Sequence, residues 1–499
     1  MTAVVREGGR SARQRGRVVA ALAALIAVPL VFDAVRPSSV KRTEIPKRVV
    51  TDLARASDRQ AQSSVWFCAG GAVRTGATRD APARLSVTVT NPGAIPSRGH
   101  LTWVIGGEPN TVVQVEVPAG SVQAFRLEDS VPQISGALAK GQSSGAGAIL
   151  EFDRGGLAVD HRVETASSGS TAPCASSVGE RAVALGGSTS LGTQTLITIL
   201  NPFPGDAVFD IRFFTDSGTT KPTVVRGITV ASESIRLVDI GAIVRRRRVV
   251  DTEVIARTGR VIVDRTTIVR DGPSRGIVLG TSAALPSIRA FFTSGFLSRN
   301  REERYEIVNP GDSPTRLDVA VLVAPPVAGE APSEIVPFQL DVAAGTREEL
   351  DLANTEVPVG RDFSVVFTGT RPFLAARVVS ARPDKTGLGR GPATTPGAET
   401  GATQWILPAN AAALTIFNVS SDPTTATVKS STGSVLATMK VAPGASRDVA
   451  VPPSTAPGVQ ALLVEADFPV LVGRRFSATS PVNSWALPLA IVTDEGLVP

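Results

Sequence analysis

Hydrophobic and polar residues alternate along much of this chain, and an asparagine ends the alternation at regular intervals. This happens four times, at Asn91, Asn201, Asn309 and Asn418. Proline follows the first three asparagines and valine follows the fourth. Alternation with a period of two predicts a β-strand with one buried face. Asn-Pro predicts the turn that ends the strand, because proline has no amide hydrogen to donate and presets its own φ.

The spacing of these asparagines predicts a repeated domain. The steps between them are 110, 108 and 109 residues, which suits a small domain and is too long for a solenoid unit. Each copy also has an opening apolar strand, a small-residue turn, and an apolar strand that ends in a basic residue. The turns lie at 118–121, 230–233, 343–346 and 442–445. About seven strands fit each copy, which predicts an all-β fold of tandem immunoglobulin-like β-sandwich modules.

These features divide the chain into segments. The predicted modules are residues 61–177, 178–286, 287–381 and 403–499, with a Pro- and Gly-rich linker at 382–402. Before them come a basic tail (1–17), an apolar segment (18–35) and a first linker (36–60). The sequence therefore predicts one N-terminal hydrophobic segment followed by four β-sandwiches.

The apolar segment 18–35 is interrupted only by Pro29 and Asp33. Its length is at the short end of the roughly 20 residues that span a bilayer, and five arginines precede it, so it predicts a transmembrane helix with a cytoplasmic N-terminus. No small-x-small cleavage motif directly follows it. We therefore expect an uncleaved signal-anchor, with the bulk of the chain extracytoplasmic. Secretion after cleavage of a signal peptide is the alternative.

The charge distribution argues against nucleic-acid binding. The chain has a net charge of +6, and residues 1–48 alone contain ten Lys or Arg and three acids, a net +7. The remaining residues are therefore close to neutral, at −1. Binding to a phosphate backbone needs basic side chains clustered on the folded body. We expect no nucleic-acid partner.

Cys68 and Cys174 are the only cysteines, and an even number in an exported chain predicts a disulfide. A bridge across about 100 residues contributes up to ~4–5 kcal/mol on the entropic model. Two unpaired buried thiols are the alternative. Two cysteines and two histidines scattered over the chain predict no metal site. No calcium-binding, phosphate-loop or dinucleotide pattern is found, so no cofactor is expected.

The order of these landmarks resembles that of exported β-sandwich repeat proteins of actinobacteria, in particular the domain-of-unknown-function family numbered 5719. The similarity covers roughly residues 60–490. It rests on Trp66–Gly71 for the opening motif, on Asn91-Pro92 and Asn201-Pro202 for the central motif, and on Arg265, Arg377 and Arg474 for the closing basic position. The second copy departs by opening with Ala-Val-Ala, and the fourth by having Val419. The resemblance implies an envelope-associated protein of unknown activity and supplies no catalytic residue.

Two patterns are similar to catalytic motifs. Residues 141–145 match the G-x-S-x-G nucleophile elbow around Ser143, which needs a strand-to-helix turn and a downstream histidine base. Only His161 follows, in a predicted strand where later copies have arginine, so a flexible loop accounts better for the pattern. His100 and His161 are also candidates for acid–base work, although surface or edge positions account for them. We predict no catalytic residue.

Two sets of arginines are candidate contacts. Arg265, Arg377 and Arg474 recur at one position, where they would either grip an anionic envelope polymer or pair with carboxylates or carbonyls at the junctions between modules. The repetition favours the junctions. Arg245–Arg248 is the densest charge run. It predicts either a solvated loop or a contact with anionic lipid or cell-wall phosphates.

The sequence as a whole predicts a non-catalytic, membrane-anchored protein of the cell envelope. We expect its modules to act as a binding or scaffolding array, with contacts made by loops or sheet edges. Its expected partners are the membrane, through the N-terminal helix, and a cell-wall polymer or envelope protein. One alternative is an accessory subunit of an envelope glycan-assembly enzyme. The other is a hydrolase whose site lies between modules.

Overall fold

The computed structural model describes residues 53–73, 84–131, 144–165, 168–272, 274–283, 285–353, 355–382, 391–408, 411, 413–451, 461–475, 490–493 and 497. The predicted basic tail and membrane segment (1–35) lie outside these residues. Within the described part, no helix is long and apolar enough to cross a membrane. Residues 50–498 form one compact unit.

The first module consists of two four-stranded antiparallel sheets, in the orders β2-β7-β4-β5 and β6-β3-β8-β9. The predicted alternation is clear in β3, where Leu85, Val87 and Val89 are buried between the sheets and Ser86 and Thr88 are half-buried. The elements are β2 (Ser64–Val73), β3 (Arg84–Thr90), β4 (Ser97–Ile105), β5 (Thr111–Val117), β6 (Val122–Arg126), α2 (Leu127–Ser130), β7 (Ser144–Phe152), β8 (Ala158–Glu164) and β9 (Gly169–Pro173).

The second module repeats this arrangement with a five-stranded sheet, β10-β16-β12-β13 with β14 beside β12, and a four-stranded sheet, β15-β11-β17-β18. Its core contains Phe209 and Phe213. The elements are β10 (Arg181–Gly187), β11 (Thr193–Asn201), β12 (Ala207–Thr215), β13 (Gly218–Thr220), η1 (Thr223–Val225), β14 (Ile228–Val230), β15 (Ser234–Asp239), η2 (Ile240–Ala242), β16 (Val250–Thr258), β17 (Ile262–Val269) and β18 (Gly276–Thr281).

In the third and fourth modules one long strand takes part in both layers of the sandwich. The first half of β24 pairs with β19 and β21, and its second half pairs with β20 and β25. The third module contains β19 (Ser287–Phe296), β20 (Arg301–Asn309), β21 (Thr315–Val323), β22 (Glu334–Val342), β23 (Thr346–Asp351), β24 (Asp362–Ala381) and β25 (Gly391–Pro396). The fourth contains β26 (Ala402–Pro408), β27 (Ala413–Asn418), β28 (Thr424–Ser430), β29 (Val435–Val441), β30 (Ser446–Ala450), β31 (Ala461–Arg475) and β32 (Ile491–Thr493), and β1 (Arg55–Ala56) pairs in parallel with β32.

The all-β prediction is confirmed, but the strand order is not that of an immunoglobulin sandwich. In that fold the first strand shares a sheet with the second, fourth and fifth strands. Here the first strand, β2, shares a sheet with the third, fourth and sixth, which are β4, β5 and β7. The Pro- and Gly-rich stretches between copies also contain strands, namely β9, β18 and β25. In β25, which lies inside the predicted linker 382–402, Pro392 and Pro396 are tolerated because the strand pairs only with β24.

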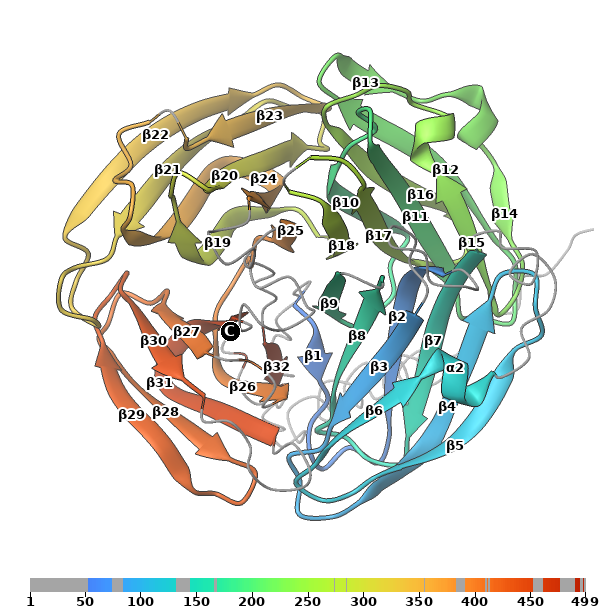
Figure 1. Cartoon of the computed structure of the whole chain (residues 1–499), viewed down its shortest axis with the longest axis horizontal. Helices are drawn as coiled ribbons and strands as arrows, with labels where there is room; N and C mark the ends of the chain where they lie inside the picture. Colours follow the sequence, from blue (N-terminus) through green and yellow to red (C-terminus); the bar gives the residue numbers. More distant parts are fainter. Residues whose placement is uncertain are drawn as a thin grey trace, which may run out of the picture. The chain divides into compact units, whose positions relative to one another are not determined.

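The four modules follow one another in a closed ring within this unit (Figure 1). At each junction the opening strand of one module packs on an inner strand of the next, so that β2 meets β17, β10 meets β24 and β19 meets β31. The last junction returns to the first module, where β26 meets β3 and Ile406 packs into the first core. The modules are therefore not independent domains on a string.

The repeated asparagine has the same structural role in every module. All four are buried, and the side-chain Oδ1 of each accepts a hydrogen bond from the backbone amide two residues later. The Nδ2 group donates to the carbonyl four residues later and to that of a valine across the sandwich, over distances of 2.7–3.3 Å. Asn418 makes these bonds although Val419 follows it. The asparagine, and not the proline, is the constant part of this turn.

The small-residue turn that faces each asparagine requires a left-handed backbone conformation. Its third residue is Gly120, Gly345 or Gly444 in three modules, with φ of 66°, 66° and 70°. In the second module the residue with this conformation is Glu233, the fourth of the turn, with φ of 48°. Glycine adopts this region freely, whereas a residue with a Cβ is strained there. The sequence pattern of small residues is thus explained by backbone geometry.

Candidate functional site

The basic residue that closes each copy is buried in all four modules. His161, Arg265, Arg377 and Arg474 lie on β8, β17, β24 and β31, and none is more than 2% exposed. Neighbouring residues of a strand point to opposite faces. The basic residue therefore lies at the edge of its own core, while the residue before it faces the preceding module in the ring. A polymer outside the protein has no access to these three guanidinium groups.

Arg474 forms the contact between the fourth module and the first. Its Nη1 and Nη2 donate to Oδ2 and Oδ1 of Asp160 at 2.5 and 2.7 Å. Asp160 is the residue before His161 on β8, and both members of the pair are buried. Two parallel charge-assisted hydrogen bonds fix direction as well as distance. This pair closes the ring.

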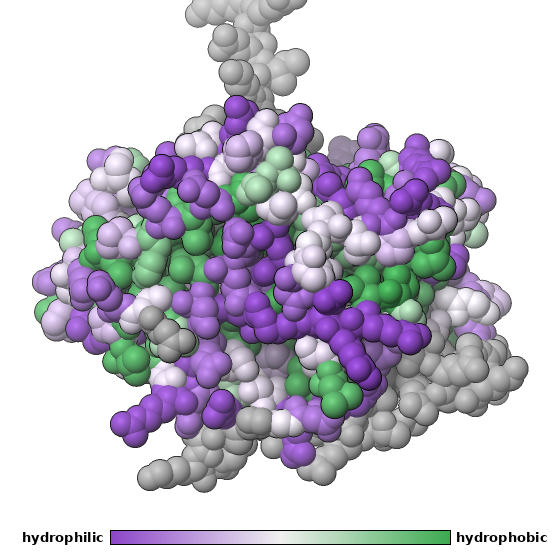
Figure 2. Space-filling view, turned by 90° about the horizontal axis from the view of Figure 1, so that it is seen from above, coloured by the Kyte–Doolittle hydropathy of each residue, from purple (hydrophilic) through white to green (hydrophobic). Residues whose placement is uncertain are grey.

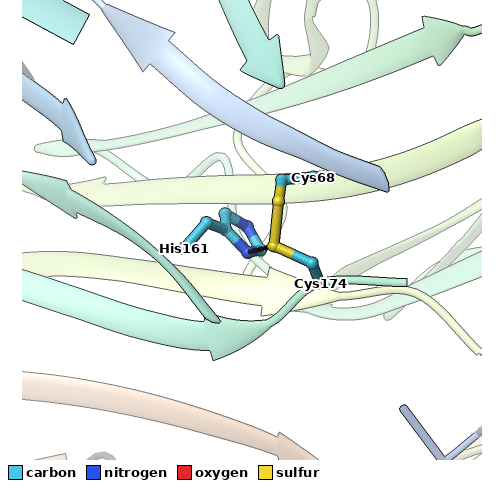
Figure 3. Close-up of side chains that lie close together, drawn as sticks. All are labelled: Cys68, His161 and Cys174. Atoms are coloured by element: carbon cyan, nitrogen blue, oxygen red, sulfur yellow. Dashed lines mark hydrogen bonds between the residues drawn. A yellow bond between two sulfur atoms is a disulfide. The ribbon is translucent and has the colours of Figure 1, made fainter. Parts of the chain in front are cut away.

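The same contact recurs at the next junction with histidine in place of arginine. His161 Nε2 lies 3.1 Å from Oδ2 of Asp264, which is the residue before Arg265 on β17. The geometry is not that of a good hydrogen bond, so we describe it as an electrostatic contact. The other ring nitrogen, Nδ1, lies 3.4 Å from Sγ of Cys174 (Figure 3).

The predicted disulfide between Cys68 and Cys174 is present. It joins β2 to the segment after β9, inside the first module, and both sulfurs are buried. Although the cysteines and histidines are scattered along the sequence, ligand atoms of Cys68, His161 and Cys174 lie within 4.8 Å of one another. With the two sulfurs bonded to each other there is no thiolate, so this state is not a metal site.

The third and fourth modules lack the aspartate that precedes the basic residue in the first two. Ala376 and Gly473 stand where the first two modules have aspartate, so Arg265 and Arg377 have no carboxylate at that position. Arg265 donates to Thr267, and burial lowers its pKa to about 10. Arg377 donates to the backbone carbonyl of Thr293. Arg265 and Arg377 therefore make these hydrogen bonds within their own modules.

A separate charged cluster joins the second and third modules. Asp251 on β16 accepts hydrogen bonds from the Gly186 amide at 2.8 Å and from Nε of Arg347 on β23 at 3.1 Å. Glu306 on β20 accepts from the same amide at 3.1 Å. Burial, and then the nearby Glu306, raise the pKa of Asp251 well above its ordinary value. The two carboxyls thus share the Gly186 amide inside this junction, while Asp251 pairs with Arg347 and Glu306 pairs with Arg304 at 3.2 Å.

The run Arg245–Arg248 forms a loop that is fixed by its backbone. The Arg247 amide donates to Thr189 Oγ1 at 3.0 Å, and its carbonyl accepts from the Thr189 amide at 2.9 Å. Arg248 pairs with Glu349 of the third module at 2.9 Å. Arg245 and Arg246 are exposed. The solvated-loop interpretation describes these two side chains, while Arg248 makes a contact between modules.

A cavity of about 250 Å³ lies where the third and fourth modules meet. Asp362 and Ser364 on β24, Ser294 on β19, and Asp448 and Arg475 on β30 and β31 are among its lining residues. The Asp448 carboxylate pairs with Arg475 and accepts a 2.6 Å hydrogen bond from the Thr415 hydroxyl. Burial, and then the nearby Asp448, raise the pKa of Asp362.

Ser294, which lines this cavity, has a strained backbone conformation. Its φ is 61°, a left-handed value that is uncommon for a residue with a side chain. The register of β19 and β24 shifts at this point, between Phe292 and Gly295. The buried Ser294 hydroxyl has no hydrogen-bond partner among the described residues. Such strain is more frequent at binding sites than elsewhere.

The two histidines that are candidates for acid–base work are not brought together. His100 is exposed on β4, whereas His161 is buried on β8 in the other sheet. Ser143 lies outside the described residues. Asp160 and Asp264 were not predicted, although the repeated Val-Asp before the basic residue was a usable signal. The cavity had no such signal, because its residues come from distant strands of two modules.

The comparisons with known proteins give one finding. No curated protein matches this sequence. The model of a family described as "Family of unknown function (DUF5719)" matches residues 179–452, which span the second and third modules and about half of the fourth. Trp66–Gly71, the expected opening motif, lies before the matched span. Since the match covers more than half of the chain, the protein belongs to the DUF5719 family of unknown function.

Proposed function

We propose that this protein is a non-catalytic, extracytoplasmic component of the cell envelope. Its N-terminal segment anchors it in the membrane, and its ring of modules acts as a rigid platform for binding or scaffolding. The observation that carries the proposal is the buried Arg474–Asp160 pair, which joins the last module to the first. A closed ring holds its loops and cavities at fixed distances, and binding residues commonly lie on loops positioned by such a scaffold.

Two features support a location outside the cytoplasm. The Cys68–Cys174 disulfide is of the kind that persists in oxidising compartments. The apolar run at 18–35, preceded by arginines, is typical of a signal-anchor. The face in Figure 2 is mainly hydrophilic, with separate hydrophobic patches. That pattern suits a surface in contact with water or a polar polymer.

The cavity between the third and fourth modules is where we expect a ligand to bind. Its carboxylates and hydroxyls, which include Asp362, Ser294 and Ser364, are groups that hydrogen-bond to sugar hydroxyls. Its volume of about 250 Å³ is just below the roughly 300–1,000 Å³ of ligand pockets. The cavity therefore suits a single sugar unit of an envelope glycan.

Location is tested on the full-length protein in intact cells. Protease added from outside should degrade the modules and leave the N-terminal tail in the membrane fraction. Release of the whole chain into the medium would indicate a cleaved signal peptide. Protection of the modules in intact cells, with digestion after lysis, would contradict the proposal.

Binding is tested with isolated cell wall. The wild-type protein should sediment with the wall, and Asp362→Asn should weaken this binding if the cavity is used. Asp341→Asn is the matched control, because Asp341 is an exposed residue of β22 in the same module. If the protein instead co-purifies with a membrane enzyme and does not bind the wall, the accessory-subunit alternative is favoured.

A further inference from the structure

The disulfide of the first module lies beside a histidine that contacts a carboxylate of the second. We propose that Cys68, His161 and Cys174 form a binding site for one zinc-class divalent ion when the disulfide is reduced. The disulfide and the metal are then alternative states of one buried site. Nothing in this inference depends on the proposed envelope function.

The spacing of the three side chains already approaches that of a metal site. In a tetrahedral zinc site, with Zn–S of about 2.3 Å and Zn–N of about 2.0 Å, sulfur and nitrogen ligands lie about 3.5 Å apart and two sulfurs about 3.8 Å apart. The Cys174 Sγ to His161 Nδ1 distance is 3.4 Å. Once the S–S bond is cleaved, the two sulfurs must separate to non-bonded distance, which is close to the spacing that zinc requires.

Asp264 supplies the group that orients the histidine. With Nδ1 facing the sulfur, Nε2 faces Oδ2 of Asp264 at 3.1 Å (Figure 3 shows the ring pointing at Cys174). Metal-binding histidines commonly donate their second N–H to a carboxylate, which fixes the tautomer and makes the ligand more basic. Because Asp264 belongs to the second module, the same contact ties the site to the junction. Three protein ligands leave a fourth position for water.

The chemistry needs a reductant, and a dithiol is sufficient. Two electrons and two protons convert the Cys68–Cys174 disulfide to two thiols, while the dithiol is oxidised to its own disulfide. Binding of the divalent ion to the two thiols then releases two protons, because the thiolates are the ligands. A metal-loaded site therefore has no free thiolate with which to re-form the disulfide, and oxidation expels the ion.

The experiment uses full-length protein in detergent, reduced with a dithiol and freed of it without oxygen. Co²⁺ is the probe, since thiolate coordination gives it charge-transfer absorption. Because Cys68 and Cys174 are the only cysteines, thiol titration measures reduction directly. We expect one Co²⁺ per reduced chain, displacement by Zn²⁺, and no such absorption from oxidised protein.

Two variants test whether His161 is a metal ligand and whether Asp264 orients it. Asp264→Asn should weaken Co²⁺ binding by about 10–100-fold and keep the absorption, whereas His161→Ala should weaken it more and change the spectrum. His100→Ala, at the only other histidine, should match wild type. The proposal is overturned if His161→Ala binds as wild type does, or if oxidised protein gives the same signal. It is also overturned if reduced protein binds no Co²⁺, or unfolds and is not refolded by Co²⁺.

Discussion

Arg474 and Asp160 lie 314 positions apart in the sequence and form a two-pronged ion pair in the interior of the protein. Arg474 belongs to the last module and Asp160 to the first. Removing two charges from water is costly, and the cost is recovered only when the geometry is good and both charges remain. The closure of the ring is therefore sensitive to the loss of either partner.

Arg474→Met should destabilise the protein by about 3–5 kcal/mol, because it leaves the Asp160 carboxylate buried without its partner. Urea unfolding followed by circular dichroism measures the change. Arg475→Met is the control, since Arg475 is about a third exposed and pairs with Asp448 near the surface, where loss of a pair costs about 0–1 kcal/mol. Adding Asp160→Leu to Arg474→Met should restore much of the stability. An equal effect of the two arginine variants would show that the pair does not hold the ring.

Replacing both cysteines, as Cys68→Ser with Cys174→Ser, should lower the free energy of unfolding by about 2–5 kcal/mol. The bridge closes a loop with a sequence separation of 106, so its removal enlarges the unfolded ensemble considerably. Denaturant midpoints of the variant and of wild type, with and without reductant, provide the measurement. The reductant should affect only the wild type, and an unchanged midpoint would contradict the prediction.

Asn309→Ala should destabilise the third module by roughly 1–3 kcal/mol, because carbonyls of Ser313 and Val342 lose their donor in a buried turn. Asn300→Ala is the matched control, as Asn300 is exposed in the same module. Thermal unfolding of both variants checks this. Similar melting temperatures would mean that the repeated asparagine is not a structural requirement.

Gly345→Glu should cost about 1 kcal/mol, because a side chain at φ of 66° is strained. A Cβ at this glycine meets no atom within 4 Å, so the effect isolates the backbone term. The reverse change, Glu233→Gly, removes that strain from the second module. It should be neutral or slightly stabilising, since glycine has more freedom to lose on folding. We expect the denaturant midpoint to fall for Gly345→Glu and to stay the same or rise slightly for Glu233→Gly.

The pH dependence of stability should contain a contribution from Asp251. Its folded pKa is raised, so in the unfolded chain it ionises near pH ~4 while the folded protein keeps the proton to higher pH. The stability contributed by Asp251 is therefore complete below about pH 4 and falls as the pH rises toward the folded pKa. Asp251→Asn keeps an oxygen for the Gly186 amide and should flatten this slope.

Urea unfolding from about pH 2 to pH 8 measures both slopes. Asp210→Asn is the opposite control, because the hydrogen bond from Arg257 is the main cause that lowers the pKa of Asp210. Its contribution is present above the unfolded pKa and is lost as the pH falls. Parallel curves for wild type and Asp251→Asn would contradict the assignment of Asp251.

Much of the fold could be predicted because its local determinants repeat. Alternating apolar residues, as at Leu85, Val87 and Val89, indicated strands correctly, and the Asn-Pro steps marked turns correctly. Which strands pair with one another could not be predicted from the sequence. The sheet that contains β2 also contains β4, β5 and β7, and nothing in their sequences states which strand lies beside which. The proline and threonine content of segments such as 391–396 predicts a linker, but 391–396 is an edge strand, and edge strands tolerate proline.

The candidate sites, too, could be predicted only in part. The disulfide followed from counting cysteines, and the recurring basic position was visible in Arg265, Arg377 and Arg474. Their burial was not visible. A cation at the end of an apolar strand has the same local sequence whether it faces solvent or the next module.

By itself, the sequence determined the strands, the fourfold repeat, its turns and the position of a basic residue in each copy, because short-range periodicity and backbone preference specify these. Only the tertiary structure decided that the modules close into a ring, that Arg474 meets Asp160, and that His161 lies between a disulfide and Asp264. The contacts of Arg474 with Asp160 and of His161 with Asp264 join residues that are more than a hundred positions apart. They depend on how whole modules pack, which local patterns do not encode.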